Sequence, residues 1–260
     1  TAEDILDAAQ LMNQLCIKFR KNAAFTLDCN LLSFLQKCHH LSNTISGDKN
    51  ILEHQEDNGH TAPHLRTEQL SIQKLSYAVL NHVVSNNVSE ILLSPTNISS
   101  LEAILQSMSE GAISVEDPLM KKTCLTFFRQ LLDQWVTTEN TRANDKSNPV
   151  LYPAPDHVVQ GYIQYICGTL IPGMMQVFLQ RNVNFNINDA NNFRLLFEFS
   201  TILEILKTRL PEDVVDQTIL RLGLPPELIE GIRSAGTHKE FEISLKDLIQ
   251  KNNQLQGPTR

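Results

Sequence analysis

Two consecutive segments decide the fold: DHVVQGYIQYICGTLIPGMMQVFL, residues 156–179, and ANNFRLLFEFSTILEILK, residues 190–207. Apolar residues of the second segment recur at three- and four-residue steps and form two adjoining stripes. One stripe contains Phe193, Leu196, Phe199, Leu203 and Leu206, and the other contains Leu195, Ile202 and Ile205. A helix on the surface of an ordinary globule buries one stripe, whereas two stripes let it pack against its hairpin partner and against the next hairpin. The pattern predicts a helical solenoid, with Arg194 and Glu198 paired on the remaining polar face.

The first segment is also long enough to cross a membrane, because no charged residue follows Asp156 until Arg181 if His157 is neutral. Four glutamines, at positions 160, 164, 176 and 180, would each need hydrogen-bond partners in hydrocarbon, and Pro172-Gly173 interrupts the run. These features favour a buried helix pair over membrane insertion. They also predict a kink or a restart of the helix at Pro172.

Composition is that of an ordinary globular protein: 260 residues, 42% hydrophobic and 20% charged. The net charge of −7 argues against a protein that coats nucleic acid over its whole surface, although one basic face remains compatible with it. Five cysteines without paired spacing indicate reduced, intracellular usage. Because the chain begins at Thr1 and shows no signal peptide, we expect it to be a piece of a longer protein.

Helical spacing continues on both sides of the central pair, and no stretch alternates with a strand period, so we predict an all-α fold. The expected helix 1–19 buries Ile5, Ala9, Met12, Leu15, Cys16 and Phe19. Further helices are expected at 28–45, 67–84, from about 101, and at 118–135, 212–222, 226–234 and 239–252. The predicted organisation is a helical hairpin (1–46), a flexible polar loop (47–66), HEAT-like helices (67–136), a linker (137–155) and C-terminal HEAT repeats (156–260).

The helix 118–135 has a clear division between its faces. Its inward set is Met120, Cys124, Phe127, Phe128, Leu131 and Trp135. Its outward set is Lys121, Lys122, Arg129 and Asp133. This helix therefore combines a large apolar face with a predominantly basic one.

Neither a metal site nor an active site is indicated. His54, His60 and His64 lie in the polar loop, but their spacings match no recognised zinc pattern, so we interpret them as solvated. The chain has no glycine-rich phosphate loop and no HExxH, CxxC or GxSxG motif. We therefore expect a protein that is not an enzyme and binds no cofactor or metal.

Helices joined in pairs at a rough period of 40 residues are typical of HEAT-like repeats. Within this pattern, three segments resemble the carboxyl-terminal HEAT repeats of exportin-T, the tRNA exportin branch of the importin-β karyopherins. They are KKTCLTFFRQLLDQW (121–135), GYIQYICGTLIPGMMQVFLQ (161–180) and NDANNFRLLFEFSTILEILKTRL (188–210). The resemblance is clearest from Pro118 to Asn252 and rests on core and kink residues.

The resemblance implies a monomeric carrier that binds folded tRNA together with GTP-bound Ran, contacts nuclear pore proteins, and shuttles between nucleus and cytoplasm. Because duplex RNA presents phosphates and 2′-hydroxyls, outward cations are the groups such a carrier needs. The candidates for RNA binding are Lys121, Lys122, Arg129, Arg181, Arg194 and Lys207. For any single one of them, a solvated charge beside an acidic neighbour such as Glu198 or Asp133 is favoured over RNA contact, so the prediction concerns the set. The alternative function is a HEAT scaffold or a karyopherin that carries protein cargo.

Overall fold

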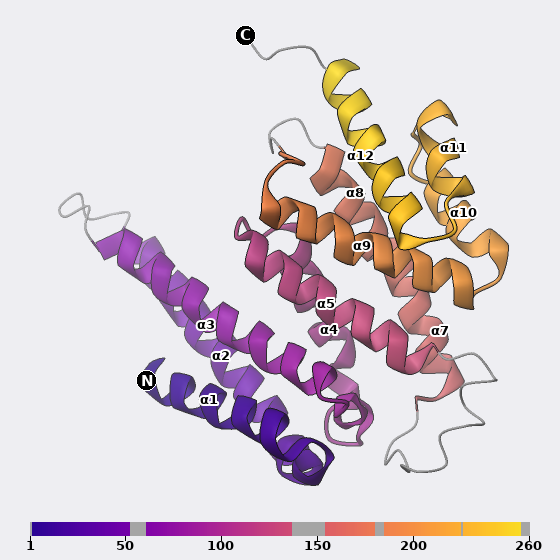
Figure 1. Ribbon diagram of the computed structural model, residues 1–260. Helices are drawn as coiled ribbons and strands as arrows, with labels where there is room; N and C mark the ends of the chain where they lie inside the picture. The colour runs from indigo at the N-terminus through magenta and orange to yellow at the C-terminus, as the bar shows by residue number, and fades with distance from the viewer. Residues whose placement is uncertain (1, 53–60, 137–153, 180–184, 225, 256–260) are drawn as a thin grey trace. The chain divides into compact units, whose positions relative to one another are not determined.

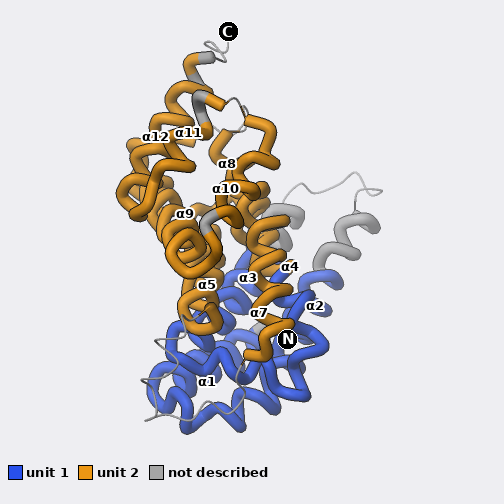
Figure 2. The backbone as a smooth tube through the Cα atoms, turned by 90° about the vertical axis from the view of Figure 1, so that its right-hand side faces the viewer, with its two compact units in different colours: residues 1–105, 150–153 blue, residues 106–149, 154–260 orange. Residues whose placement is uncertain are grey.

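The structure is a computed structural model that describes residues 2–52, 61–136, 154–179, 185–224 and 226–255 (Figure 1). Every regular element in these ranges is helical, which confirms the predicted all-α fold. The chain divides into two compact units (Figure 2). Unit 1 comprises residues 1–105 and 150–153, and unit 2 comprises residues 106–149 and 154–260.

Unit 1 is built on three long helices that pack against one another. They are α1 (Ala2–Phe19), α2 (Ala24–Leu52) and α3 (Thr61–Ser85), with the short helix η1 (Arg20–Ala23) joining α1 to α2. Two further short helices, η2 (Ser89–Leu93) and η3 (Ile98–Ser100), lead into α4 (Leu101–Ile113). The core contains Cys16, Leu27, Leu31, Val79 and Val83, each with almost no exposed surface.

A buried polar network attaches the irregular segment of unit 1 to α2. The amide of Asn97 donates to the Asp28 carboxylate at 2.7 Å and to the carbonyl of Ile91 at 3.0 Å, and the Ser94 hydroxyl also donates to Asp28. Since η2 and η3 leave many backbone groups without helical partners, these side-chain bonds replace part of the missing ladder.

Part of the predicted loop of residues 47–66 is helical in the structure. Helix α2 continues through Gly47 to Leu52, and α3 begins at Thr61, so that only residues 53–60 of the predicted loop lie outside the described residues. An internal glycine costs a helix only about 1 kcal/mol relative to alanine and does not end it alone. The predicted linker largely coincides with residues 137–153, which also lie outside the described part.

Unit 2 consists of two layers of helices. One layer contains α5 (Pro118–Trp135), α9 (Ala190–Arg209) and α12 (His238–Leu255), with α9 packed between the other two. The second layer contains α7 (Asp156–Tyr165), α8 (Ile171–Leu179) and α10 (Glu212–Leu220), as the side view shows (Figure 2). The remaining helix, α11 (Pro226–Ser234), packs against α10 and α12. Stacking of helices in two layers is the packing of an α-solenoid, as the two apolar stripes of α9 predicted.

The helix irregularity expected at Pro172 occurs one turn earlier. Residues Ile166–Leu170 form a π-helical segment, η4, and the helix then continues as α8 through Pro172 without restarting. Proline has no N–H to donate and its ring crowds the carbonyl four residues before it, here that of Gly168. A π-helical turn at this point accommodates the crowded carbonyls without ending the helix.

The apolar stripes of α9 are buried with one exception. Leu196, Phe199, Leu203 and Leu206 of the first stripe have no more than 1% of their surface exposed, whereas Phe193 is 39% exposed. Behind this helix, the rings of Phe199 and Phe178 meet edge to face with centroids 5.3 Å apart, so α9 contacts α8 as well as α5 and α12. The interior of unit 2 therefore surrounds α9 on three sides.

Residues Asp156–Leu179 are long and apolar enough to cross a membrane by length and composition alone, and half of their most apolar window is buried within the fold. The buried part is specifically packed. The Tyr162 hydroxyl donates to the carbonyl of Phe128 at 2.8 Å, and the Tyr162 ring meets Trp135 edge to face at 5.3 Å. At the other end, Gly173 allows the helix to approach Ile113 so closely that a β-carbon would overlap that side chain. These contacts are those of a core helix.

Candidate nucleic-acid interface

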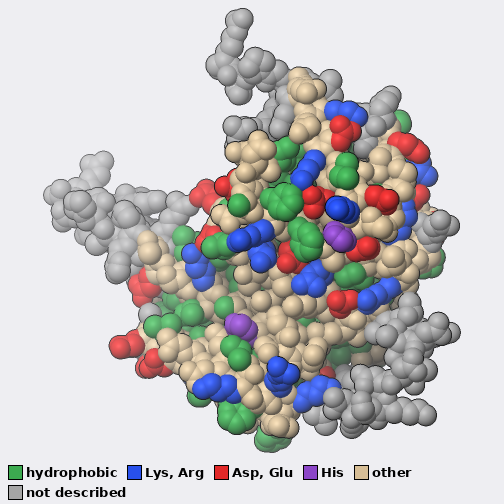
Figure 3. Space-filling view, in the orientation of Figure 1, with side chains coloured by type: hydrophobic (Ala, Val, Ile, Leu, Met, Phe, Trp, Pro, Cys, Tyr) green, Lys and Arg blue, Asp and Glu red, His purple; other side chains and the backbone are tan. Residues whose placement is uncertain are grey.

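Helices α5 and α9 carry five of the six basic residues singled out in the sequence, and the layer that they form with α12 faces the viewer in Figure 1 and Figure 3. Helix α9 is fixed at its start by Asp189, whose carboxylate accepts from the backbone amides of Asn191 at 2.8 Å and Asn192 at 3.1 Å. This N-cap satisfies two amides that would otherwise lack partners. The first turn of α9, which directly precedes Arg194, is therefore held in place.

The two lysines at the start of α5 have different environments. Lys121 is 8% exposed, and its ammonium donates to the carbonyl of Ile113 at 2.9 Å. Burial lowers the pKa of Lys121 from its ordinary value. The sequence placed Lys121 on the outward face, and this expectation is wrong: its long side chain folds back to cap the last turn of α4. Lys122 is partly exposed on the same helix.

Arg129 points toward α9 instead of solvent. Its Nε donates to the carboxylate of Glu198 at 2.7 Å, and the Glu198 side chain is only 8% exposed. The expected pairing of Arg194 with Glu198 along α9 is therefore replaced by a pairing between helices. A buried carboxylate such as that of Glu198 needs a strong hydrogen-bond donor. Arg129 reaches it from the neighbouring helix α5, whereas Arg194, on the same helix as Glu198, remains exposed to solvent.

Arg194 is exposed, and Arg181 lies outside the described residues. Lys207 is partly buried, because its ammonium donates to the carbonyl of Arg233 and lies 5.9 Å from the centre of the Phe241 ring. It therefore links α9 to α11 and α12. Of the six predicted cations, Lys122 and Arg194 combine a described position with outward exposure and no assigned internal partner.

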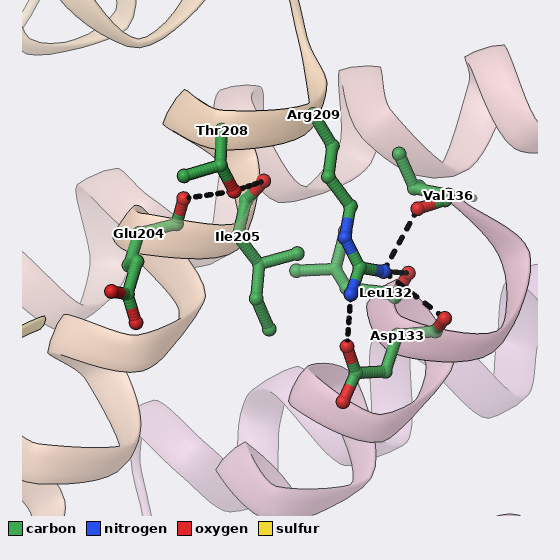
Figure 4. A network of polar contacts seen from close by, with 7 residues as sticks. All are labelled: Leu132, Asp133, Val136, Glu204, Ile205, Thr208 and Arg209. Atoms are coloured by element: carbon green, nitrogen blue, oxygen red, sulfur yellow. Dashed lines mark hydrogen bonds and ion pairs between the residues drawn. The ribbon is translucent and has the colours of Figure 1, made fainter. Parts of the chain in front are cut away.

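Arg209, which sequence reasoning missed, joins the ends of two helices (Figure 4). Its Nη1 donates to the carbonyls of Leu132, Asp133 and Val136 at 2.9 to 3.3 Å, and its Nη2 contacts the Asp133 carboxylate at 2.5 Å. A cation at a helix C-terminus satisfies carbonyls that lack helical partners. Its position in the last turn of α9 was visible in the sequence, but the helix that it caps was not.

Aromatic and charged side chains also meet between α9 and α12, in a set we call the α9–α12 patch. The ammonium of Lys246 lies 4.3 Å from the centre of the Phe193 ring, and His238 meets Phe197 edge to face at 5.4 Å. His238 also lies 3.4 Å from the carboxylate of Glu204. Both phenyl rings are about two-fifths exposed. The patch therefore presents apolar surface within a rim of both charge signs.

Side chains that could bind a metal are not clustered in the described residues. No group of three or more histidine, cysteine, aspartate or glutamate side chains is placed to hold a metal within these ranges. His54 and His60 lie outside them. Burial raises the pKa of Cys16 and of Cys38 to about 11 and raises that of Cys124 further, which leaves these thiols protonated and unreactive at neutral pH.

Comparison with known proteins identifies the lineage. The family model described as Exportin-T matches residues 1–252. The chain is 24% identical to the exportin-T of Oryza sativa subsp. japonica over 98% of its own length, and 21% identical to that of Mus musculus over 88%. It spans 24% and 21% of those two relatives, which is about a quarter of their length or less. No solved structure gives a significant match. Because the family model covers nearly the entire sequence, the chain belongs to the exportin-T family.

Proposed function

We propose that this chain is part of a nuclear export receptor of the karyopherin type, which binds tRNA cooperatively with GTP-bound Ran and carries it from the nucleus to the cytoplasm. The observation that carries the proposal is the match of the exportin-T family model to residues 1–252. As such a carrier, the protein acts as a monomer, contacts nuclear pore proteins and shuttles between the two compartments. In this proposal the carrier itself catalyses no reaction: it holds tRNA through non-covalent contacts and releases it when the GTP bound to Ran is hydrolysed in the cytoplasm.

The construction of unit 2 supports this proposal. Shallow interfaces between stacked helices let a solenoid flex, so that binding free energy can offset the deformation needed to enclose a large cargo. Lys122 and Arg194 are the outward cations that we assign to the phosphates of tRNA. Both lie on the layer that contains α5 and α9, whose relative position is fixed by Arg129 with Glu198 and by Arg209.

The other predicted cations take a different role in the proposal. Three of them each donate a hydrogen bond to an internal partner: Lys121, Arg129 and Lys207. We assign to them the positioning of helices α5, α9 and α11. Replacing any of them would alter RNA binding only through the shape of unit 2, and the loss of stability would accompany the loss of affinity.

Transport of a protein cargo is the second candidate, and the α9–α12 patch favours it. Phe193 and Phe197 are 39% and 43% exposed beside charged side chains of both signs. Partly exposed aromatic residues within a polar rim are typical of protein interfaces. The two candidates differ in the response to salt, because protein binding through apolar contacts lacks the release of condensed counterions that accompanies phosphate binding.

The test is made with the full-length receptor and GTP-loaded Ran. The double variant Lys122→Glu with Arg194→Glu should weaken binding of many tRNAs alike. It should also reduce the slope of log affinity against log salt by roughly 0.7 to 0.9 for each lost contact. Lys239→Glu, which changes an exposed lysine of α12, is the matched control. Retention of both affinity and slope in the double variant would remove these residues from the cargo surface.

A second experiment addresses the cargo itself. Pull-down of the intact receptor from nuclear extract, with and without GTP-loaded Ran, should enrich tRNA only when Ran is present. Sequencing the recovered RNA measures that enrichment. Recovery of proteins without RNA would support the alternative cargo class and would contradict the proposal.

A further inference from the structure

The turn from α1 into α2 concentrates positive charge in a chain whose net charge is −7. Lys18, Arg20 and Lys21 occur within four residues, in the sequence KFRKNAAF of residues 18–25. Lys18 and Arg20 are exposed, Lys21 is partly exposed, and none of the three forms an ion pair with a described residue. In Figure 3, basic and hydrophobic side chains gather at the lower edge, where Figure 1 shows this turn. We call residues 18–25 the α1–α2 corner.

Two phenyl rings project from the same corner. Phe19 is 53% exposed and Phe25 is 80% exposed. The helical period of α1 predicts that Phe19 is buried, but α1 ends at that residue and the short helix η1 leads the chain away. Ala23, Ala24 and Leu27 are buried beneath the turn. The exposed rings therefore extend from an anchored turn and not from a free loop.

The backbone of the corner is strained at its central cation. Arg20 has φ of +46°, in the left-handed region that glycine and asparagine occupy most readily. An arginine at this position places a cation at the turn, but its left-handed backbone conformation is higher in energy than it would be for glycine. Strain of this kind persists at sites where the side chain is needed.

We propose that the α1–α2 corner binds unpaired RNA. Phe19 and Phe25 stack on exposed bases, and Lys18, Arg20 and Lys21 contact the flanking phosphates. Cations that follow a backbone and aromatic rings that receive bases are the two components of single-strand binding surfaces. In duplex RNA the bases stack on one another inside the helix, so they have no free face on which the two phenyl rings could stack. The proposal shares with the proposed function only the chemical class of the ligand.

An acidic protein segment is the other class of ligand that a basic corner could attract. Protein interfaces place their main aromatic contacts in well-packed pockets. One hollow in unit 1, of about 520 Å³, is lined by Asp4, Ile5, Ser33 and other residues from the start of α1 and the middle of α2, and not by Phe19 or Phe25. Phe25, at 80% exposure, instead presents nearly its whole surface, as a stacking platform requires.

The first test compares Phe25→Ala with the unchanged 260-residue chain, using fluorescence anisotropy of labelled RNA. The single-stranded probe is an oligouridylate of about 12 nucleotides, within the site sizes of known single-strand binders. Loss of one stacked base should weaken its binding roughly 5- to 150-fold. Binding of a blunt duplex of equal length should stay the same. Ile243→Ala removes a similarly exposed apolar side chain from unit 2 and should affect neither probe.

Phe25→Trp restores an aromatic ring and supplies a spectroscopic readout. It should retain oligouridylate binding, and its emission should be quenched when the RNA is added. The native Trp135 is buried in unit 2, so its emission should remain unchanged. Absence of quenching in a variant that still binds would contradict stacking.

Two cation variants test the phosphate contacts. Lys18→Gln should reduce the salt slope for oligouridylate by roughly 0.7, whereas Lys239→Gln should leave it unchanged. Arg20→Gly should raise the melting temperature of the chain by relieving the left-handed conformation, while binding weakens. A structural role alone would not separate stability from affinity in this way.

The outcomes distinguish the proposal from its rivals. Unchanged affinity in Phe25→Ala, or an equal loss for duplex and single strand, would overturn it. Tighter binding of a poly-glutamate peptide than of oligouridylate would assign the corner to an acidic protein. Phe25 is not among the residues assigned to the phosphates of tRNA, so Phe25→Ala tests oligouridylate binding separately from the test of tRNA binding by Lys122→Glu with Arg194→Glu, and failure of the tRNA proposal would not be mistaken for failure of this one.

Discussion

Replacing Arg129 by alanine should destabilise unit 2 substantially, because it leaves a buried carboxylate without its cation. The Glu198 side chain is 8% exposed and accepts from Arg129 at 2.7 Å, while the Arg129 side chain is 24% exposed. Breaking a buried ion pair by removing one partner costs about 3 to 5 kcal/mol. Since Arg129 is partly hydrated, we expect a cost of about 3 kcal/mol, at the lower end of that range.

The assay is urea unfolding followed by the fluorescence of Trp135, the only tryptophan of the chain. Trp135 lies buried at the end of α5, so its signal reports unit 2 without requiring that both units unfold together. Arg194→Ala is the matched control. It removes an exposed cation one helical turn before Glu198, and we expect a change within about 0.5 kcal/mol.

A rescue variant separates the lost pair from lost packing. Arg129→Met with Glu198→Leu replaces both charges by apolar side chains, and such exchanges are often neutral or stabilising. We expect the double variant to unfold within about 1 kcal/mol of the parent chain. If Arg194→Ala cost more than Arg129→Ala, or if Arg129→Ala cost less than about 1 kcal/mol, the interhelical pair would not be the significant one.

Three other substitutions test separate parts of the structure. Phe199→Ala removes a fully buried ring between α8 and α9 and should cost about 3 to 5 kcal/mol, while Leu196→Ala should cost about 2 to 5 kcal/mol, both measured by Trp135 fluorescence. Arg209→Ala leaves the carbonyls at the end of α5 without donors and should cost about 1 to 3 kcal/mol in the same assay; an unchanged unfolding midpoint would contradict its capping role. Burial lowers the pKa of His82 below 6.5, so the unfolded chain binds more protons and stability is lost as pH falls through 6.5. His82→Gln should flatten that loss between pH 7 and 5 in thermal melts of unit 1, whereas an identical pH profile would contradict it.

The sequence determined the class of fold and the buried faces of the strongest helices. Two adjoining stripes on residues 190–207 predicted a helix enclosed by several neighbours, and α9 contacts α5, α8 and α12. The inward set of helix 118–135 was also correct, because all six of its members are buried. Periodicity succeeds here because burial of a wide apolar face dominates the free energy of each long helix.

Periodicity did not predict burial correctly at helix ends, where a residue has fewer neighbouring helices to pack against. Phe193 in the first turn of α9 and Phe19 in the last turn of α1 follow the apolar period but are substantially exposed. A terminal residue has a partner helix on one side only, and the chain beyond it can turn away. The exposed ring of Phe19 is what gave the α1–α2 corner its aromatic surface.

Partners of charged side chains were decided only by the tertiary structure. The sequence paired Glu198 with Arg194, four residues away, but its carboxylate binds Arg129, which is 69 residues distant along the chain. It placed Lys121 outward, but the ammonium reaches the last turn of α4. Long, flexible side chains choose among donors and acceptors within several ångströms, and those distances between helices exist only after the layers have packed. The apolar periodicity of a helix is determined by its own sequence. The position of a charged side chain at a candidate binding surface also depends on which other helix packs beside it, and only the tertiary structure decides that.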